Sequence, residues 1–244
     1  MKIIFLNCWQ GKVWDNLSTF LKKQEKDTDT FCFVEVSPKL HSKFSDLLIG
    51  FNGVYESEKL KGLDGIEYGQ SVFVRTGFDI QESKKISLYK NLSNDIGFMQ
   101  VVDIQINDKS LLIANIHGMS NPGDKLDTLF RLKQSKIIIK HFIQKLKRPI
   151  IITGDFNLLP DTKSIKLFEK ADYRNLIKEF KIKSTRNKIA WQHFKNDPNF
   201  VKQYYADYCF VSKDIKVKNF TVPDIEISDH LPLILEFEIH PHTN

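Results

Sequence analysis

The chain has 244 residues, enough for one large domain with a substantial core. Hydrophobic residues make up 41% and charged residues 27%, which is typical of a globular protein and excludes an intrinsically disordered chain. The 36 Lys and Arg exceed the 30 Asp and Glu, and the formal net charge is +6. This surplus favours an anionic partner such as a phosphate-containing substrate, although solvated helix faces and strand edges also account for many of the lysines.

The cysteines and the first residues bear on localisation. Cys8, Cys32 and Cys209 lie in apolar segments, at spacings that fit neither a disulfide framework nor a zinc site, so we interpret them as buried thiols in a reducing compartment. The first apolar segment reaches polar Asn7 too early for a secretion signal, and no segment approaches the roughly 18 apolar residues of a membrane span. These features predict a soluble cytoplasmic protein without a membrane span. They give no indication of an oligomeric state.

Short apolar segments rich in β-branched residues recur along the chain and predict strands, with helical patterns between several of them. Segment 70–116 is expected to be mostly strands joined by short turns, one of them at 107–109. The predicted elements are, in order, strand 2–8, helix 16–26, strand 31–36, helix 39–49, strands 71–75, 98–106 and 111–116, helix 124–147, strand 149–153, helix 162–170, and strands 205–211 and 231–239.

The longest predicted helix, 124–147, has apolar residues at intervals of three, four and seven. Its expected core-facing side consists of Leu129, Leu132, Ile139, Ile143 and Leu146. The consecutive strands before this helix imply antiparallel pairing, whereas strands separated by helices suggest parallel pairing. The sequence therefore predicts mixed sheets flanked by helices, in a single domain over residues 1–244 without repeats or linkers.

Polar residues lie at the ends of several predicted strands. Singly, each has a structural explanation as a strand-edge acid, a turn residue or a core histidine. They occur in the runs Phe-Leu-Asn (5–7), Phe-Val-Glu (33–35), Asn-Ile-His (115–117), Gly-Asp-Phe-Asn (154–157), Tyr-Ala-Asp (205–207) and Ser-Asp-His (228–230). The candidate site residues are Asn7, Glu35, His117, Asp155, Asn157, Asp207, Asp229 and His230.

The four acids in this set suggest a metal. A carboxylate held against an apolar core must be paired, hydrogen-bonded or bound to a cation, and several clustered carboxylates repel one another. A hard divalent cation resolves this repulsion. Magnesium, with manganese as a substitute, fits best because it needs only one or two protein carboxylates, and no zinc-type spacing is present.

Taken together and in this order, the motifs resemble those of the endonuclease/exonuclease/phosphatase superfamily, which includes deoxyribonuclease I, exonuclease III type AP endonucleases, neutral sphingomyelinases and inositol polyphosphate 5-phosphatases. The resemblance spans residues 2–238, and its most specific parts are Gly-Asp-Phe-Asn at 154–157 and Ser-Asp-His at 228–230. It implies an α/β (α+β) four-layer sandwich, with two mixed β-sheets packed face to face and helices on both outer faces. It also implies a metal-dependent phosphoester hydrolase.

The resemblance assigns a metal-binding role to three residues. Glu35 is similar to the principal metal ligand of the family. Asn7 is its neighbour and positions metal or phosphate. Asp229 is a further metal ligand or an acid that supports the ligands.

The remaining motif residues match the catalytic groups of the family. Asp155 matches the residue that orients or deprotonates the attacking water, and Asn157 holds a phosphate oxygen. His230 contacts the scissile phosphate with Asp207 as its carboxylate partner, and His117 lies over the phosphate. Such groups stabilise the charge that develops on phosphate oxygens during hydrolysis.

The motifs say less about the substrate than about the reaction, because the choice of substrate depends on the loops around the site. AP endonucleases carry an acid where this chain has Trp9 and typically a tyrosine where it has His117, so we expect a more general phosphodiesterase or nuclease. A phosphatase or phospholipid phosphodiesterase of the same superfamily is the alternative, and a noncatalytic anion-binding module is a second. Nucleic acid is a plausible partner. Arg131, early in helix 124–147, is a candidate substrate contact, but solvation on the helix face explains it equally well.

Segment 181–205 mixes basic and aromatic residues, as nucleic-acid-contacting loops do. Packing of Trp191 and Phe194 beneath the loop explains the same pattern.

Overall fold

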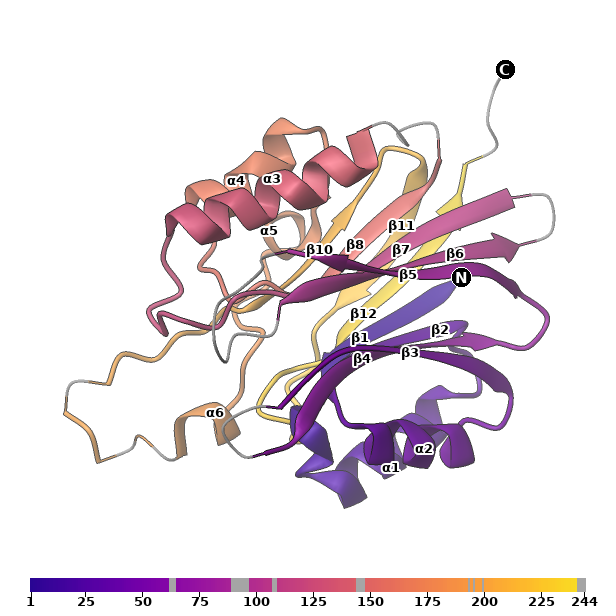
Figure 1. Ribbon diagram of the computed structural model, residues 1–244, viewed down its shortest axis with the longest axis horizontal. Coiled ribbons are helices and arrows are strands. Elements are labelled where there is room, and N and C mark those ends of the chain that lie inside the picture. Colours follow the sequence, from indigo (N-terminus) through magenta and orange to yellow (C-terminus); the bar gives the residue numbers. More distant parts are fainter. Residues whose placement is uncertain are drawn as a thin grey trace.

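The computed structural model describes residues 1–61, 65–88, 97–106, 109–143, 148–192, 194, 196–198 and 200–240. Two β-sheets pack face to face, and helices cover the outer face of each sheet, so the protein has four layers (Figure 1). This is the predicted sandwich. The predicted turn at 107–109 falls largely on residues outside the described ranges.

Within the described ranges each sheet has six strands. In spatial order the first consists of β11 (Ile215–Thr221), β12 (Leu233–Ile239), β1 (Lys2–Asn7), β2 (Thr30–Val36), β4 (Glu67–Arg75) and β3 (Phe51–Lys61). The second consists of β5 (Asp79–Ser87), β6 (Phe98–Ile106), β7 (Lys109–His117), β8 (Ile150–Asp155), β10 (Asp207–Val211) and β9 (Arg174–Asn175). The pairs β1–β2 and β7–β8 are parallel and their other neighbours are antiparallel, so both sheets are mixed.

The inner strands are buried on both faces, and their alternating side chains belong to different layers. In β1, Ile3 and Phe5 pack in the core between the sheets, whereas Ile4 and Leu6 pack in the core beneath the helices. Helix α1 (Trp14–Gln24) contributes buried Leu17 to the latter core. Both sheets are thereby fixed in register with the helices that cover them.

The helix layers flank the sheets in Figure 1. Helix α2 (Pro38–Leu47) lies with α1 on the first sheet, and α3, α4 and α5 lie on the second. Their bounds are α3 (Leu129–Ile143), α4 (Lys163–Lys170) and α5 (Leu176–Glu179); a 3-10 turn (Trp9–Gly11) follows β1, and the short α6 (Ile189–Gln192) lies in the loop before β10. None of the described helices is both long enough and apolar enough to cross a membrane.

The predicted core face of the long helix is only partly confirmed: Ile139 packs against the core, two other residues are exposed, and Leu146 lies outside the described residues. Leu129 is 85% exposed and Ile143 is 55% exposed. The buried face of α3 carries instead Arg131, Gln134, Ser135, Ile138 and Phe142. Arg131 and Gln134 lie on this face because they bind the loop that precedes the helix, and apolar periodicity does not record such contacts.

Buried polar side chains also join the two sheets. The amide of Asn115 in β7 donates to the Phe33 carbonyl oxygen in β2 at 2.9 Å, and that of Gln70 in β4 donates to the Phe98 carbonyl oxygen in β6 at 2.8 Å. The three cysteines are free and buried, as predicted.

Candidate active site

The two parallel strand pairs bring four predicted site residues to one edge of the sandwich. Asn7 and His117 are the last residues of β1 and β7, Asp155 is the last residue of β8, and Glu35 lies one residue before the end of β2. His117 is directly opposite Asp155 in the register of the second sheet. Because parallel strands end at the same edge and the sheets are stacked, side chains distant in sequence converge here.

Asn7 bridges the two sheets. Its Nδ2 donates to Glu35 Oε1 at 2.9 Å and to Asp155 Oδ2 at 3.0 Å, and its Oδ1 accepts the backbone N–H of Trp9 at 3.1 Å. Asn7 and Asp155 are both buried. One amide thus fixes the separation of two carboxylates from different sheets.

A β-bulge positions Glu35. The register of β2 with β4 shifts between Val34 and Val36, and Glu35 has a positive φ of 57°. A bulge interrupts the alternation of side chains between the two faces of a sheet and so redirects one side chain. A positive φ at a non-glycine residue is a strained conformation, and such conformations are concentrated at functional sites. Here it aims the carboxylate at Asn7 and His117, whose Nε2 lies 3.7 Å from Glu35 Oε1.

The Gly-Asp-Phe-Asn turn holds Asp155 against the core. A Cβ atom at Gly154 would collide with the Ile116 carbonyl oxygen of the neighbouring strand, so the close approach of β7 and β8 requires glycine. Asp155 Oδ1 accepts the backbone N–H of Asn157 at 2.9 Å, and Asn157 has a φ of 52°, which asparagine tolerates better than most residues.

Asp207 and His230 form a buried pair. His230 Nδ1 lies 3.0 Å and 2.9 Å from the two carboxylate oxygens of Asp207, and its Nε2 lies 3.7 Å from Asp155 Oδ2. Burial lowers the pKa of His230, but the Asp207 carboxylate outweighs this effect and the pKa is raised. Burial raises the pKa of Asp207. The pair fixes the ring orientation, with Nε2 directed toward Asp155.

Asp155 remains acidic although it is buried. Burial alone would raise the pKa of its carboxyl, but nearby cationic side chains, first His230 and then Lys125, lower it below the ordinary value. The edge of the sandwich therefore holds a carboxylate anion surrounded by groups that bind anions.

The chemistry of the donor set fits a divalent cation. Glu35, His117 and Asp155 each offer one ligand atom, and these atoms lie within 4.8 Å of one another. Carboxylate oxygens are ligands that hard cations such as Mg²⁺ accept.

Asp229 lies beside this group. Its Oδ2 accepts from Arg186 Nη2 at 2.8 Å and lies 3.9 Å from His230 Nε2. Ser228 Oγ donates to the Asn7 carbonyl oxygen at 2.7 Å, which anchors the Ser-Asp-His motif to the end of β1. Of the two roles predicted for Asp229, support of neighbouring groups fits this placement better than metal ligation.

Lys125 was missed by sequence reasoning. It is 6% exposed, its Nζ donates to Asn157 Oδ1, and burial lowers its pKa. Its backbone has a φ of 58°, and its carbonyl oxygen accepts the Leu159 N–H at 2.9 Å. Nothing in the sequence distinguishes it from the many other lysines.

Arg131 is not a substrate contact, which corrects the prediction. It is fully buried, and its guanidinium donates to the carbonyl oxygens of Met119, Ser120, Pro122 and Leu126. It also lies 3.3 Å from Asp124. Its position early in α3 turns it toward the loop that precedes the helix, so it supports the loop that carries Lys125.

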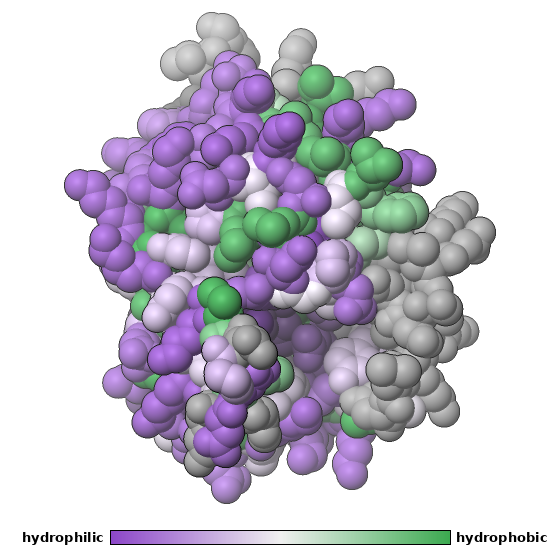
Figure 2. Space-filling view, turned by 90° about the vertical axis from the view of Figure 1, so that its left-hand side faces the viewer, coloured by the Kyte–Doolittle hydropathy of each residue, from purple (hydrophilic) through white to green (hydrophobic). Residues whose placement is uncertain are grey.

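The site opens on the face shown in Figure 2, which is largely hydrophilic and is hollowed between its upper and lower parts. The reactive groups lie deep in this face: His117 is 9% exposed, Asp155 2% and His230 3%. A shielded site of this kind strengthens electrostatic interactions with a bound anion.

Comparisons with known proteins show the family and the fold of this chain. A sequence profile described as Endonuclease/Exonuclease/phosphatase family matches residues 5–230. No curated protein matches the sequence.

Solved structures with the same fold cover almost the whole chain. A protein of this family from Bacteroides thetaiotaomicron is 18% identical, with a TM-score of 0.77 and coverage of 99% of this chain and 98% of the other. The mannosyl-6-phosphatase Bt3783 of the same organism is 18% identical, with a TM-score of 0.75 and coverage of 98% and 100%. The human Nocturnin catalytic domain with bound sulfate is also 18% identical, with a TM-score of 0.73 and coverage of 98% and 94%. With the profile match over nearly all of its length, the chain belongs to the endonuclease/exonuclease/phosphatase family, whose enzymes hydrolyse phosphoesters.

Proposed function

We propose that this protein is a magnesium-dependent phosphodiesterase of the nuclease type. The observation that carries the proposal is the convergence of Glu35, Asp155 and the Asp207–His230 pair at one edge of the sandwich. A carboxylate cluster next to a buried histidine is the arrangement that phosphoester hydrolysis requires: an acceptor for the proton of water and donors for phosphate oxygens.

Glu35, which Asn7 joins to Asp155, is the residue that would hold the cation. When bound, Mg²⁺ or Mn²⁺ supplies positive charge that offsets the negative charge of the phosphate oxygens. The carboxylate oxygens face each other across the Asn7 amide, at 2.9 and 3.0 Å from its nitrogen. Asp229, bound to Arg186, keeps the adjacent loop in place.

The chain's own groups would carry the proton transfer and the binding of phosphate. Asp155, held as an anion, orients water and accepts its proton. His230, kept in one orientation by Asp207, directs Nε2 to a phosphate oxygen. Asn157, supported by Lys125, and His117 provide further hydrogen bonds to the phosphate.

A neighbouring cavity favours a diester over a monoester. A hollow of about 670 Å³ adjoins the site and is lined by Arg186, which binds Asp229, and by Leu231, which follows His230. A phosphodiester has a second substituent that such a space accommodates. One structural neighbour is named a mannosyl-6-phosphatase, so a monoester is the alternative that an experiment must exclude.

The test compares hydrolysis of bis(4-nitrophenyl) phosphate and 4-nitrophenyl phosphate with Mg²⁺, with Mn²⁺ and with a chelator. We expect turnover of the diester only with metal, and at least tenfold lower kcat/KM for the monoester. Preference for the monoester would establish a phosphatase and refute the proposal. Turnover of neither substrate would support a noncatalytic anion-binding module.

A further inference from the structure

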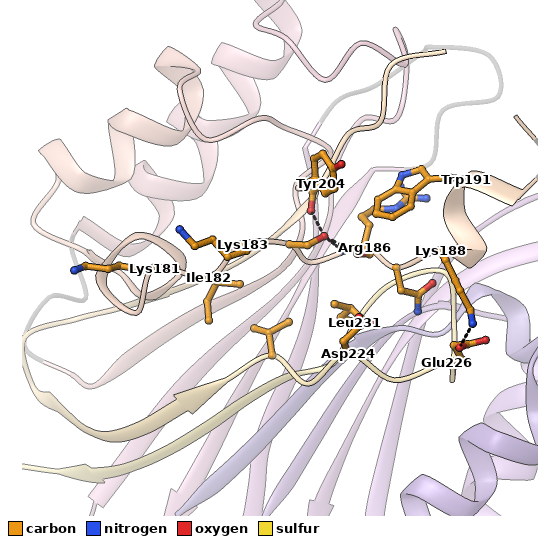
Figure 3. A pocket seen from close by; sticks show the side chains of 13 residues that line it. Lys181, Ile182, Lys183, Arg186, Lys188, Trp191, Tyr204, Asp224, Glu226 and Leu231 are labelled. Atoms are coloured by element: carbon orange, nitrogen blue, oxygen red, sulfur yellow. Dashed lines mark hydrogen bonds and ion pairs between the residues drawn. The ribbon is translucent and has the colours of Figure 1, made fainter. Parts of the chain in front are cut away.

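The hollow beside the catalytic groups has walls of mixed character (Figure 3). Trp191 and Tyr204 lie on one side, and Asp224 and Glu226 lie on the other. Basic residues at its margins come from segment 181–188, and its apolar lining includes Ile182, Val222 and Leu231. We call this hollow, of about 670 Å³, the aromatic pocket.

The aromatic pocket is rigidly connected to the catalytic groups. Thr185 Oγ1 accepts the backbone N–H groups of Ala206 and Asp207 at 3.0 and 3.2 Å. The backbone of Thr185 pairs with Tyr204 and Leu231, each at 2.8 Å, and Arg186 forms a β-bridge with His230. A ligand in the pocket would therefore be held in a fixed position relative to His230.

The rings of the pocket are arranged to receive a flat partner. Trp191 and Tyr204 meet edge to face, with centroids 5.2 Å apart, and Tyr204 is 45% exposed. Trp191 lines the pocket, and Lys202 Nζ lies 5.2 Å from the centroid of its ring. Aromatic side chains presented in this way stack on unpaired nucleic-acid bases.

Positive charge is available where phosphates would lie. Lys181 and Lys183 are exposed at the margin, whereas Lys188 is paired with Glu226 at 2.7 Å. Arg186 Nη2 binds Asp229, but its buried Nε has no hydrogen-bond partner among the residues that the structure describes. An oxygen acceptor on a ligand would satisfy this donor.

A second hollow continues beyond these lysines. It has a volume of about 320 Å³, shares Lys181, Ile182 and Lys183 with the aromatic pocket, and is also lined by Lys166 and Lys178. Lys166 and Lys178 are paired there with Asp161 and Glu169, so Lys181 and Lys183, where the two hollows adjoin, are the cations best placed for the phosphates of a longer anionic chain.

We propose that the aromatic pocket is a subsite for an unpaired nucleotide of a single-stranded polynucleotide substrate, with its base on Trp191 and its neighbouring phosphates on Lys181 and Lys183. The proposal rests on the phosphodiesterase function and specifies its substrate class. The acyl chain of a phospholipid fits this pocket less well, because it has no use for the two acids and the cationic side chains around it. Asp224 supplies an acceptor for an amino or hydroxyl group of the nucleotide.

The first test measures specificity. For wild type and Trp191→Ala, kcat/KM is measured on a 12-nucleotide oligothymidylate and on bis(4-nitrophenyl) phosphate with Mg²⁺. We expect the ratio of the two values to fall roughly tenfold or more in Trp191→Ala, because stacking on one aromatic ring has about that effect, and Trp191→Phe to restore most of it. An unchanged ratio in a folded Trp191→Ala protein would overturn the proposal even if the diester is still hydrolysed.

The second test measures binding and does not depend on turnover. Fluorescence anisotropy gives the Kd of the labelled oligonucleotide for the Asp155→Asn protein across a series of salt concentrations. Removing both Lys181 and Lys183 by substitution with Ala should reduce the slope of log Kd against log salt by about 1.4, whereas Lys22→Ala with Lys23→Ala, on exposed positions of α1, should leave it unchanged.

The two tests distinguish failure of the proposed subsite from failure of the proposed phosphodiesterase function. If wild type hydrolyses no diester but Trp191 and the two lysines still determine oligonucleotide affinity, the subsite stands and the proposed catalytic function fails. Binding to phosphatidylcholine vesicles that depends on Trp191, without binding to the oligonucleotide, would overturn the subsite in favour of a lipid.

Discussion

His230 Nδ1 lies within 3.0 Å of both carboxylate oxygens of Asp207, and neither side chain is appreciably exposed. One buried carboxylate thus fixes the orientation of the imidazole and raises its pKa against the effect of burial. The relationship leaves Nε2 facing Asp155, and the proposed function depends on it.

Replacing Asp207 with Asn should remove the charge that supports His230. The pKa of His230 would fall, and its tautomer would no longer be fixed by a carboxylate. We expect kcat for diester hydrolysis to fall about 10²- to 10⁴-fold, while the circular dichroism spectrum stays native. Asp172→Asn, at an exposed position, is the control. Wild-type kcat in Asp207→Asn would refute this role.

Lys125→Met should impair catalysis through Asn157. The substitution removes the donor to Asn157 Oδ1 while nearly conserving volume. A hydrogen bond to a charged group contributes about 1.5–3 kcal/mol, so we expect kcat to fall by about 10- to 100-fold. Steady-state kinetics of this variant and of Lys170→Met, on the exposed side of α4, measure the effect. Equal activity of the two variants would show that Lys125 only fills space.

Arg131→Met should destabilise the protein. Several loop carbonyl oxygens would lose their donor inside the fold, at a cost of roughly 2–4 kcal/mol. For a chain of this length Tm should fall by roughly 5–10 °C, whereas Lys133→Met, on the exposed side of the same helix, should change Tm little. A Tm within about 1 °C of the wild-type value would show that the loop carbonyl oxygens find other donors.

Asp127→Asn should reveal a helix cap that depends on pH. Asp127 accepts the backbone N–H groups of Lys163 and Ser164 at the start of α4, at 2.6 and 2.9 Å. Burial is the largest single effect and raises its pKa, but these hydrogen bonds and that of the Ser164 hydroxyl together outweigh it and lower the pKa below 3.8. A depressed folded-state pKa stabilises the protein above the unfolded value, and this contribution is lost as pH falls through the folded value.

Urea unfolding checks this expectation. The difference in unfolding free energy between wild type and Asp127→Asn should be about 1 kcal/mol at neutral pH and should shrink as the pH is lowered below 3.8. A difference that does not change with pH would mean that the charge on Asp127 contributes nothing to the cap.

The inner part of the fold was predictable from sequence, and its edges were not. The eight predicted strands correspond to the inner strands β1, β2, β4, β6, β7, β8, β10 and β12. The sheet edges β3, β5, β9 and β11 were not identified individually. Inner strands are apolar on both faces, whereas β5, with the sequence Asp-Ile-Gln-Glu-Ser-Lys-Lys-Ile-Ser, is largely exposed and carries the charges typical of an edge.

The candidate site was likewise predictable in part. Residues that end inner strands, such as Asn7 and Asp155, were found because strand ends are visible in sequence and recur in family motifs. Lys125 and Arg186 come from loops, and their contacts depend on how those loops fold back onto the sheets. Arg131 was predicted as a substrate contact or a solvated side chain. It is buried instead because it binds loop carbonyl oxygens, and such contacts leave no periodic pattern in the sequence.

The most direct test of the account is hydrolysis of bis(4-nitrophenyl) phosphate by wild type, Asp155→Asn and Asp161→Asn, each with Mg²⁺ and with a chelator. Asp161 is a matched acid, fully exposed and six positions away. The account predicts metal-dependent turnover by wild type and Asp161→Asn, and a loss of at least about 10²-fold in Asp155→Asn. Undiminished turnover by Asp155→Asn, or turnover that survives the chelator, would contradict it.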